Sequence, residues 1–395
     1  MKRYIFWALA LMTLAACQPE KENIPPALTE LIEQLRQAHA PDKRVALFNV
    51  TVERSGQQWL VTGETNLPEA LQELEEGLKA TGIKTQQEVR LLPDTSLQGK
   101  IYGVVRLSAS NIRSEPRHSA ELATQAMLGA PLRVYKETDG WFLVQTPDGY
   151  LSWLDDGGFT PMTKAAFGQW QSAPKVVFLP DMGFAYAAPA TSAPIVSDLL
   201  AGNILQLAEK KEGFAEVRFP DGRIAFIPDN QVMDYKAWLD SRQPDAGHIL
   251  ETAYTFMGRP YLWGGTSGKA VDCSGFTKTV FFLNGLQLPR DASQQVHVGQ
   301  AVETDTTLVN LQPADLLFFG RKATEELPEK ITHVAIYLGD GKIIHSSGAV
   351  KVESMRRGEP GFTEYRLLSF VRARRMLSGI GENGVIPVAA APLYQ

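Results

Sequence analysis

The chain is short of cysteine and of basic character, and each shortage narrows what it can do. Its 395 residues contain only 2 cysteines, which allow at most one disulfide. A formal net charge of −5 without any Lys/Arg-rich run excludes the basic footprint of a nucleic-acid-binding protein. The length exceeds what a single hydrophobic core supports. We therefore expect several globular domains whose two cysteines have separate tasks.

The N-terminus carries the first cysteine. Lys2 and Arg3 precede an apolar stretch, residues 4–16, that is too short to cross a bilayer and has the layout of a secretory signal. Its end, Leu14-Ala15-Ala16-Cys17, resembles the bacterial lipoprotein lipobox. The resemblance implies that residues 1–17 are a lipoprotein signal, with Cys17 acylated and anchoring the protein in the cell envelope. The alternative is an ordinary cleaved signal with a chance cysteine.

The lipoprotein hypothesis has consequences for the location of the protein and for the chemistry of its second cysteine. Gln18 offers no inner-membrane retention signal, so the expected location is the outer membrane, facing the periplasm. An acylated Cys17 cannot form a disulfide, which leaves Cys273 without a partner in an oxidising compartment. An unpaired thiol in such a place indicates a reactive residue.

Residues 18–98 form the first expected unit, which is small and of α/β type. Leu28, Leu31, Ile32 and Leu35 recur at helical spacing, and two strand-like runs and a second helix follow before a last strand. This order resembles the BON-type fold. No cluster of His, Cys or carboxylates marks a site here, so a spacer or interaction role is expected.

Two small β-barrels are expected next, over residues 99–160 and 165–240. Short strands broken by turn signals are typical of such barrels. The first region resembles the bacterial SH3-like domain through the runs 111–116, 140–144 and 148–153. The second repeats the pattern more faintly in the runs 213–217 and 220–227. Two copies of one module explain this better than two unrelated domains.

Residues 245–378 change to helices followed by strands, which indicates an α+β domain. Helices are expected over 249–257 and 273–284, and strands over 316–319, 332–338 and 342–345. Residues 379–395, rich in Gly, Pro and Ala, are expected to lie over the surface as a tail.

Cys273 opens the helix that follows Asp272, and this position favours a nucleophile. Phe276, Val280 and Leu283 make its apolar stripe. The unpaired N–H groups and the dipole of a helix N-terminus stabilise a thiolate and lower the cysteine pKa. Taken alone, a small buried cysteine that fills a core is an equally good reading.

Two histidines downstream favour the catalytic reading. His333 begins a strand that Gly339-Asp340-Gly341 turns into a second strand ending at His345. A two-residue turn would put the imidazoles on opposite faces, whereas a three-residue loop pairs His345 with Ala335, on the face of His333. We predict the longer loop, with Gly341 left-handed. His345 then orients His333, which takes the proton of Cys273.

Two alternatives compete with this triad. The histidines could merely end their strands, or Cys273 and both histidines could bind zinc. The zinc site lacks a fourth ligand and any short Cys/His spacing. The sequence therefore predicts no metal and no cofactor.

Five ordered blocks of motif-like sequence lie between residues 247 and 375. They are Arg259-Pro260-Tyr261-Leu262-Trp263-Gly264-Gly265, Asp272-Cys273-Ser274-Gly275-Phe276, Leu288-Pro289-Arg290-Asp291-Ala292-Ser293-Gln294-Gln295, Pro313-Ala314-Asp315-Leu316-Leu317-Phe318-Phe319 and His333-Val334-Ala335-Ile336-Tyr337. Together they resemble the NlpC family of cell-wall cysteine peptidases. The resemblance implies a papain-like α+β core that hydrolyses amide bonds in peptidoglycan stem peptides, with Cys273 as nucleophile, His333 as base and His345 as orienter. It places Tyr261 near the thiolate and oxyanion site.

SH3-like copies ahead of this core resemble the γ-D-glutamyl-L-diamino acid endopeptidases. In these enzymes the first SH3-like domain closes one end of the cleft. The resemblance implies that Glu121 and Tyr150, with Asp272 and Ser274, hold the free amine of an N-terminal L-alanine. A charged amine taken from water needs carboxylate partners. Trp263 is expected in the cleft wall, and Asp291 and Ser293 are further candidates for the pocket.

Each pocket residue also has a simpler reading. Asp272 could be the N-cap of its helix, alone or in addition. Glu121 could be a solvated surface carboxylate, and Tyr150 could only fill the barrel.

The expected function is hydrolysis of the γ-D-glutamyl–diamino acid (meso-diaminopimelate) amide in murein peptides with a free N-terminal L-Ala, in cell-wall turnover or recycling. The expected partners are this peptide and, through Cys17, a membrane, but no nucleic acid. Two alternatives stay open: an endopeptidase that acts on intact peptidoglycan, and a catalytically silent wall-binding lipoprotein.

Overall fold

The computed structural model describes residues 23–394, which divide into two compact units. The first contains the described residues up to Pro41 together with Phe48–Arg90, and the second contains Asp42–Leu47 and everything from Leu91 onward. The short segment Asp42–Leu47 thus belongs to the second unit although its flanks belong to the first. The expected lipoprotein signal and Cys17 lie outside the described residues. None of the helices in the described part has the length and apolar character needed to cross a membrane.

The first unit has the helix–strand–strand–helix–strand order that the sequence predicts. Its sheet has the order β1-β2-β3. Each helix buries one stripe, for example Leu28 and Ile32 in the first and Leu74 in the second. Its elements are α1 (Pro26–His39), β1 (Phe48–Ser55), β2 (Gln58–Thr65), α2 (Pro68–Ala80) and β3 (Thr85–Leu91). The resemblance to the BON-type fold stays a prediction.

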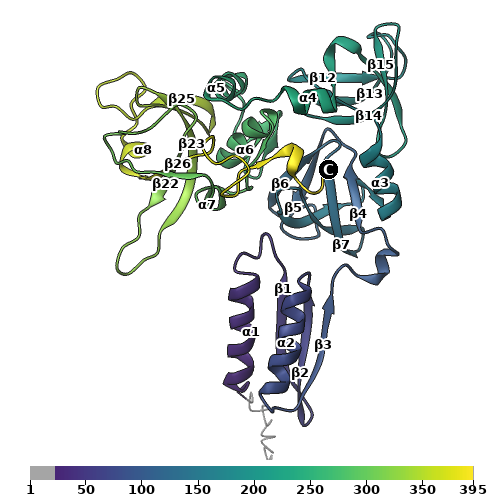
Figure 1. The fold of residues 1–395 in the computed structure, drawn as a ribbon, viewed down its shortest axis with the longest axis vertical. Coiled ribbons are helices and arrows are strands. Elements are labelled where there is room, and N and C mark those ends of the chain that lie inside the picture. The colour runs from purple at the N-terminus through teal and green to yellow at the C-terminus, as the bar shows by residue number, and fades with distance from the viewer. Residues whose placement is uncertain (1–22, 395) are drawn as a thin grey trace, which may run out of the picture. The chain divides into compact units, whose positions relative to one another are not determined.

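The second unit begins with two seven-stranded sheets built on one plan (Figure 1). The first has the order β10-β4-β7-β8-β9-β5-β6, and the second read backwards is β17-β11-β14-β15-β16-β12-β13. Each strand thus has its counterpart in the other sheet, as expected of two copies of one module. The first sheet contains β4 (Tyr102–Val105), β5 (Ala109–Arg113), β6 (Leu122–Met127), β7 (Pro131–Thr138), β8 (Trp141–Gln145), β9 (Leu151–Asp155) and β10 (Phe159–Met162).

The second copy follows α3 (Lys164–Ser172) and ends in α4 (Tyr235–Ser241). Its core is formed by aliphatic and aromatic side chains that alternate along the strands, such as Val176, Phe178 and Val217. Its strands are β11 (Lys175–Phe178), β12 (Met182–Tyr186), β13 (Ile195–Leu200), β14 (Ile204–Lys211), β15 (Phe214–Arg218), β16 (Ile224–Pro228) and β17 (Val232–Asp234).

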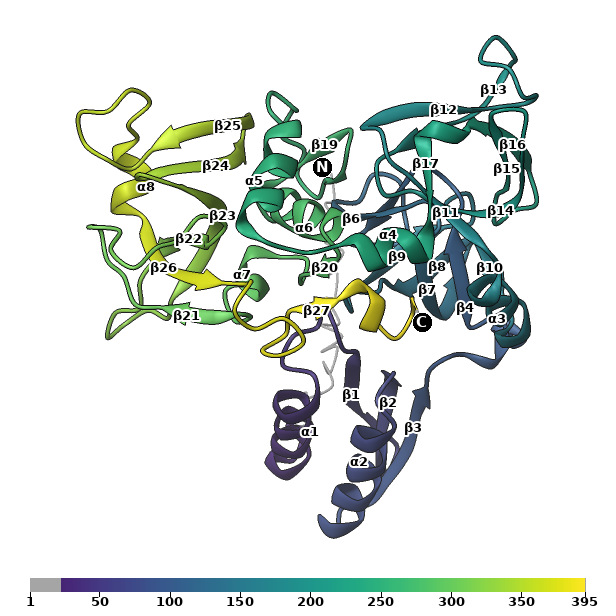
Figure 2. The ribbon, with the colours of Figure 1, turned by 45° about the horizontal axis from the view of Figure 1, so that its top comes forward.

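The last region of the second unit is α+β. Its six-stranded sheet has the order β21-β26-β22-β23-β24-β25, and α6 packs against β23 and β24. Figure 2 shows α6 between this sheet and β6 of the first barrel. The elements are α5 (Ala246–Thr255), β18 (Thr266–Ser267), β19 (Ala270–Val271), α6 (Cys273–Leu283), β20 (Leu286–Gln287), α7 (Ala292–Gln295), β21 (Gln300–Val302), β22 (Leu316–Arg321), β23 (Lys330–Gly339), β24 (Lys342–Ser347), β25 (Ala349–Ser354), α8 (Glu364–Leu368), β26 (Phe370–Arg375) and β27 (Ile386–Pro387).

The C-terminal tail is packed into the fold and does not merely lie over its surface, which corrects the expectation from composition. β27 pairs with β20, and the side chains of Val385, Val388 and Ala391 are buried. The ring of Tyr394 lies 6.2 Å from that of Phe282 on α6. Small residues in the tail allow this close packing, which overall composition did not reveal.

Candidate active site

Cys273 is the first residue of α6, and its side chain is only 7% exposed. Asp272 caps the helix, since its Oδ1 accepts a hydrogen bond from the Gly275 N–H at 2.6 Å. Gly275 is required here because a Cβ would lie 1.9 Å from the backbone oxygen of Gly265. This close approach fixes the first turn of α6 against the 264–265 segment and so positions the sulfur.

The two histidines lie on one face of the sheet, as the sequence predicts. β23 and β24 pair Ile336 with Ile344, a register that aligns His345 with Ala335. His333 Nε2 and His345 Nδ1 are 2.7 Å apart, and both side chains are buried. The remaining nitrogen of His333, Nδ1, is the one available to act on a proton from Cys273.

The turn that produces this register differs from the prediction. Gly339 pairs with Lys342, so the connection is a two-residue Asp340-Gly341 turn, with φ of 51° and 76°. A bulge at Leu338 then shifts the register by one residue. The left-handed Gly341 is confirmed, whereas the three-residue loop is wrong. A bulge has no composition signal as clear as that of a turn.

A fourth residue, Glu353 on β25, extends the pair. Its Oε2 lies 3.1 Å from His345 Nε2, and it also forms an ion pair with Lys351. A carboxylate at this nitrogen favours the tautomer with the proton on Nε2, so that Nδ1 of His345 accepts from His333. Sequence reasoning missed Glu353 because it did not predict the strand β25.

Burial controls the protonation states of the triad. Desolvation, followed by the charge of Asp272, raises the pKa of Cys273 to about 11. Desolvation and then the Arg366 charge hold the pKa of His333 well below its usual value. Burial likewise lowers the pKa of His345 to about 4, against the opposing effect of Glu353. Burial thus opposes both a charged sulfur and charged imidazoles, and it outweighs the lowering of the Cys273 pKa that was expected from the helix N-terminus.

Backbone N–H groups nevertheless favour the ionised sulfur when it forms. Those of Val334 and Ser274 both lower the pKa of Cys273. Val334 directly follows His333, so β23 brings a stabilising donor to the sulfur from the position next to the proposed base.

A cavity of about 630 Å³ opens at Cys273 and receives residues from both the first barrel and the α+β region. All eight side chains that the sequence analysis assigned to substrate binding line it: Glu121, Tyr150, Tyr261, Trp263, Asp272, Ser274, Asp291 and Ser293. Arg44, Arg290 and Lys330 also line it, and these cations were not predicted. No shared sequence spacing links Arg44 to the others, so no local signal could have found it.

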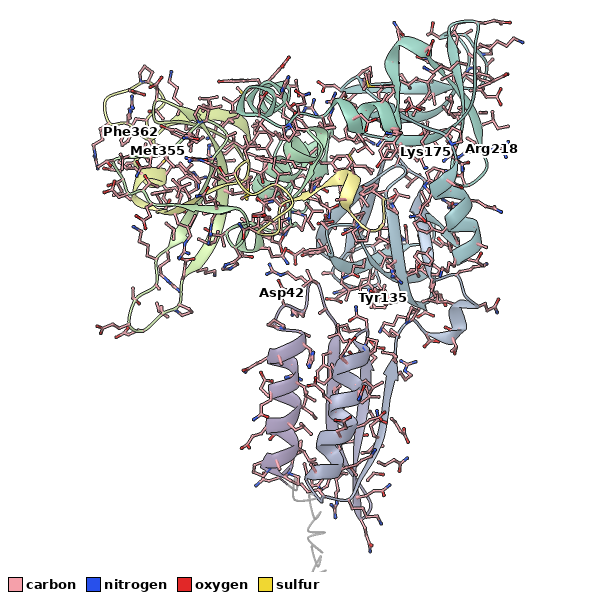
Figure 3. All side chains as sticks on the ribbon, in the orientation of Figure 1. Asp42, Tyr135, Lys175, Arg218, Met355 and Phe362 are labelled. Carbon is pink, nitrogen blue, oxygen red and sulfur yellow. The ribbon has the colours of Figure 1, made fainter. Side chains whose placement is uncertain are left out.

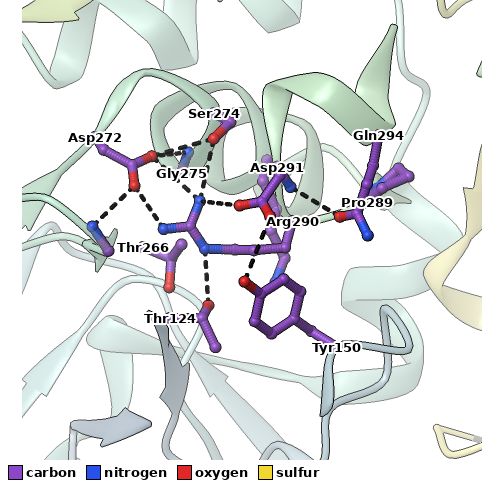
Figure 4. A network of polar contacts seen from close by, with 12 residues as sticks. Thr124, Tyr150, Thr266, Asp272, Ser274, Gly275, Pro289, Arg290, Asp291 and Gln294 are labelled. Carbon is purple, nitrogen blue, oxygen red and sulfur yellow. Dashed lines mark hydrogen bonds and ion pairs between the residues drawn. The ribbon is translucent and has the colours of Figure 1, made fainter. Parts of the chain in front are cut away.

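Arg290 is at the centre of the buried polar network beside the cavity (Figure 4). It is 1% exposed, and its Nη2 lies 2.5 Å from Asp272 Oδ2. Its Nη1 donates to Asp272 Oδ1 and Ser274 Oγ, and its Nε donates to Thr124 Oγ1 on β6 of the barrel at 3.0 Å. One guanidinium thus joins the two walls of the cavity.

Asp272 has little acceptor capacity left. Besides Arg290, its oxygens accept hydrogen bonds from Gly264 N, Gly275 N and Ser274 Oγ. A carboxylate offers about four lone-pair sites, and these contacts occupy them. The helix-cap reading of Asp272 is therefore confirmed.

Two carboxylates keep free acceptor capacity. Glu121 is exposed and accepts from Trp263 Nε1, while the indole is 63% exposed in the cavity wall. Asp291 Oδ2 accepts from Tyr150 Oη at 3.3 Å, and Oδ1 is 3.8 Å from Arg290 Nη1. Burial and the charge of Asp291 raise the pKa of Tyr150.

Tyr261 is close enough to Cys273 and Asp272 for their charges to act on it. Burial first, then those two charges, raises the pKa of Tyr261 to about 12, so its hydroxyl stays protonated and can donate. Among residues 23–394, no three His, Cys, Asp or Glu side chains are grouped as a metal site.

Known proteins share both regions that form the cavity. The NlpC/P60 family profile matches residues 258–371, and that of the bacterial dipeptidyl-peptidase Sh3 domain matches residues 112–158. A γ-D-glutamyl-L-lysine dipeptidyl-peptidase of Bacillus cereus is 31% identical over 266 residues, covering 65% of this chain and 76% of that protein. The Bacillus subtilis protein of the same name is 31% identical over 233 residues, covering 57% of this chain and 72% of that protein.

The chain belongs to the NlpC/P60 family. A crystal structure of an NlpC/P60 protein from Bacillus cereus superposes with a TM-score of 0.58 at 25% identity, covering 69% of this chain and 99% of that one. An NlpC/P60 endopeptidase from Photobacterium damselae shares the fold, with a TM-score of 0.52 at 16% identity, over 71% of this chain and 72% of that one. The α+β region is thus a papain-like NlpC/P60 domain, and the protein is a cysteine peptidase that acts on peptidoglycan-related peptides.

Proposed function

We propose that this NlpC/P60 peptidase hydrolyses the γ-D-glutamyl–diamino acid amide of murein peptides that carry a free N-terminal L-Ala. The observation that carries the proposal is the shared cavity, in which the nucleophile Cys273 lies with the carboxylates of Glu121 and Asp291. The two Bacillus relatives named for γ-D-glutamyl-L-lysine dipeptides support the same bond type.

The triad accounts for the chemistry. His333 Nδ1 takes the proton of Cys273 as the sulfur attacks the γ-carbonyl carbon, and backbone N–H groups near Cys273 stabilise the oxyanion. His333 then gives that proton to the departing amine of the diamino acid, leaving a thioester on Cys273. Water, deprotonated by His333, attacks the thioester, releases L-Ala-D-Glu and restores the thiol.

The amine of L-Ala would lie between the carboxylates of Glu121 and Asp291, near the Tyr150 hydroxyl. An ammonium removed from water needs such partners, and an acylated amine would leave the carboxylates unpaired. Asp272 and Ser274 also line the cavity, but their side chains bind Arg290. The pocket therefore favours short released peptides over stems still linked to glycan.

Turnover of matched substrates tests the proposal. Purified enzyme should release L-Ala-D-Glu from L-Ala-γ-D-Glu-meso-diaminopimelate and be inert towards the N-acetylated tripeptide, with Cys273→Ala as the inactive control. A tripeptide that carries L-lysine in the third position measures the preference for the diamino acid. Cleavage of sacculi without cleavage of the free tripeptide would instead establish an endopeptidase of intact peptidoglycan.

We further propose that the protein is anchored in the cell envelope through an acylated Cys17, facing the periplasm from the outer membrane. The lipobox-like Leu14-Ala15-Ala16-Cys17 supports this. Cells that express the full chain should incorporate labelled palmitate into it, and Cys17→Ala should abolish the label. Membrane fractionation then decides between the inner and outer membrane.

A further inference from the structure

The segment Asp42–Leu47 lies between α1 and β1 in sequence, yet it is part of the second unit. Its backbone is fixed to the first barrel at two points. The Arg44 carbonyl accepts from Leu151 N at 2.7 Å, and the Val45 carbonyl accepts from Gln145 Nε2 at 2.9 Å. Leu151 directly follows Tyr150, so the segment runs beside the wall of the cavity.

The side chains of the segment reach the opposite wall. Arg44 Nη1 donates to Asp291 Oδ2 at 2.7 Å and to Ser293 Oγ at 2.9 Å. Asp42 Oδ2 accepts from Gln294 Nε2 at 2.8 Å, and Figure 3 shows Asp42 in this loop. The segment therefore links the barrel to the start of α7.

Arg44 and Asp42 form a compensated pair. Arg44 Nε and Nη2 donate to the two oxygens of Asp42 at 2.8 and 2.7 Å. Burial raises the pKa of Asp42, but hydrogen bonds from Arg44 and Gln294 outweigh it and hold that pKa below its usual value. Because Asp42 balances the guanidinium, Arg44 can orient Asp291 without cancelling its negative charge.

The number of donors defines the role of Arg44. A guanidinium has five N–H groups, and contacts with Asp42, Asp291 and Ser293 use four of them. Arg44 is thus nearly saturated and poorly suited to receive a substrate carboxylate. Arg44 contacts Asp291 at Oδ2, whereas Oδ1 of that carboxylate lies 3.8 Å from Arg290 Nη1.

We infer that the segment Asp42–Leu47 is a third wall of the substrate pocket, in which the Asp42–Arg44 pair positions Asp291 and Ser293 to receive the peptide amine. Arg44 is a positioning residue in this scheme. The inference rests on the proposed function, since the ligand is the free amine of L-Ala. If the segment only joined the barrel to the α+β region, it would make the same contacts. Its loss would then have no effect on the preference for a free amine.

Binding, measured without turnover, tests the inference. In a Cys273→Ala background, isothermal titration calorimetry compares L-Ala-γ-D-Glu with its N-acetyl derivative. The double variant Asp42→Ala/Arg44→Ala removes a neutral pair and keeps the net charge, so a change in affinity reports positioning. Lys43→Ala is the matched control, because this exposed neighbour changes the charge without touching the pair.

The double variant should bind the free dipeptide about 10- to 100-fold more weakly, the range expected for losing hydrogen bonds to a charged group. The acetylated dipeptide should bind weakly to both proteins, so that selectivity falls. Arg44→Lys keeps the charge but lacks the planar fork of five donors, so it should lose less affinity. This variant tests the inference if the double variant fails to fold. Lys43→Ala should match the parent.

Equal selectivity in the Cys273→Ala protein and in its Arg44 variants would overturn the inference. So would a Cys273→Ala protein that binds neither dipeptide.

Failure of the proposed function gives a different result, namely that the enzyme with Cys273 intact does not cleave the tripeptide. An Arg44-dependent selectivity in binding would still stand in that case.

Discussion

Burial disfavours the charged forms of the catalytic residues. Cys273 holds its proton because ionisation would place a charge in a desolvated site beside Asp272. His333 and His345 stay neutral for the same reason, with Arg366 adding repulsion. Burial therefore opposes a free thiolate, and transfer of the Cys273 proton to His333 has to overcome this cost.

The pH dependence follows from these shifts. Since burial lowers the pKa of His333 below 6.5, the base stays unprotonated as the pH falls through that value. We expect kcat/KM to keep its plateau through pH 6.5 and to decline only at lower pH. Alkylation of Cys273 by iodoacetamide should instead rise with pH towards the thiol pKa of about 11. Rapid alkylation that is independent of pH near neutrality would contradict this and reveal a preformed thiolate.

Glu353 should matter for rate more than for stability. Glu353→Gln can donate as well as accept at His345 Nε2, so the tautomer is no longer fixed, and kcat should fall by about 10- to 100-fold. KM should hardly change, because Glu353 does not line the cavity. Glu364→Gln, at an exposed carboxylate on α8, is the control and should keep full kcat. An unchanged kcat in Glu353→Gln would exclude the tautomer role.

At the scale of elements, the site depends on the junction between α6, the loop before it and β6 of the barrel. Gly264 has φ +81°, and a Cβ there would lie 2.1 Å from the Leu122 backbone oxygen on β6. Thr266 N and Oγ1 hydrogen-bond to Gln125, also on β6. The strand thus serves as a support for the catalytic helix, and Arg290 completes the junction through Thr124.

Loss of Arg290 should be severe. Arg290→Ala leaves Asp272 buried without its ionic partner, and breaking such a pair costs about 3–5 kcal/mol of the free energy of unfolding. Urea denaturation measures the loss. Arg372→Ala is the matched control, since it breaks an exposed pair with Glu329 and should cost about 0–1 kcal/mol. Equal losses in the two variants would mean that Arg290 contributes no more than a surface charge.

The sequence predicted the regular helices and strands of the site better than its irregular features and long-range contacts. Helix α6 and the strands that carry His333 and His345 follow their apolar periodicity, and motif order located the nucleophile. The bulge at Leu338 was missed because a bulge interrupts no pattern. The strand β25 was missed although residues 350–353 alternate between apolar and polar, as a strand with one buried face does. The rise in the pKa of Cys273 was not predicted, because it depends on burial by distant segments. Arg44 was beyond reach for a similar reason, since it is 247 residues from Asp291.

Across the whole molecule, the two barrels share one plan but contribute differently. Among the described residues, those that line the cavity on the barrel side come from the first copy, such as Glu121 and Tyr150, and none comes from residues 175–234. The second copy is instead joined to the C-terminal tail, because Tyr394 packs with its buried Trp238 and Ile204. The C-terminal end of the chain therefore packs against the second barrel, which comes from the middle of the sequence.

Removal of residues 386–395 should destabilise the protein although no catalytic residue is lost. The deletion uncovers apolar surface on α6 and in the second barrel, where each buried side chain contributes about 1.5–3 kcal/mol. We expect a lower Tm by calorimetry. Glu382→Gln, an exposed change just before the tail strand, should leave Tm unchanged. An unaltered Tm after the deletion would show that the tail is dispensable.

The raised pKa of the Cys273 thiol also affects how readily the enzyme is inactivated by oxidation. Peroxide attacks thiolates, and the first product, a sulfenic acid, leads on to forms that cannot be restored. Burial raises the pKa of Cys273 and so lowers the fraction of thiolate that peroxide can attack. The burial that disfavours ionisation of Cys273 thus also protects its sulfur from oxidation.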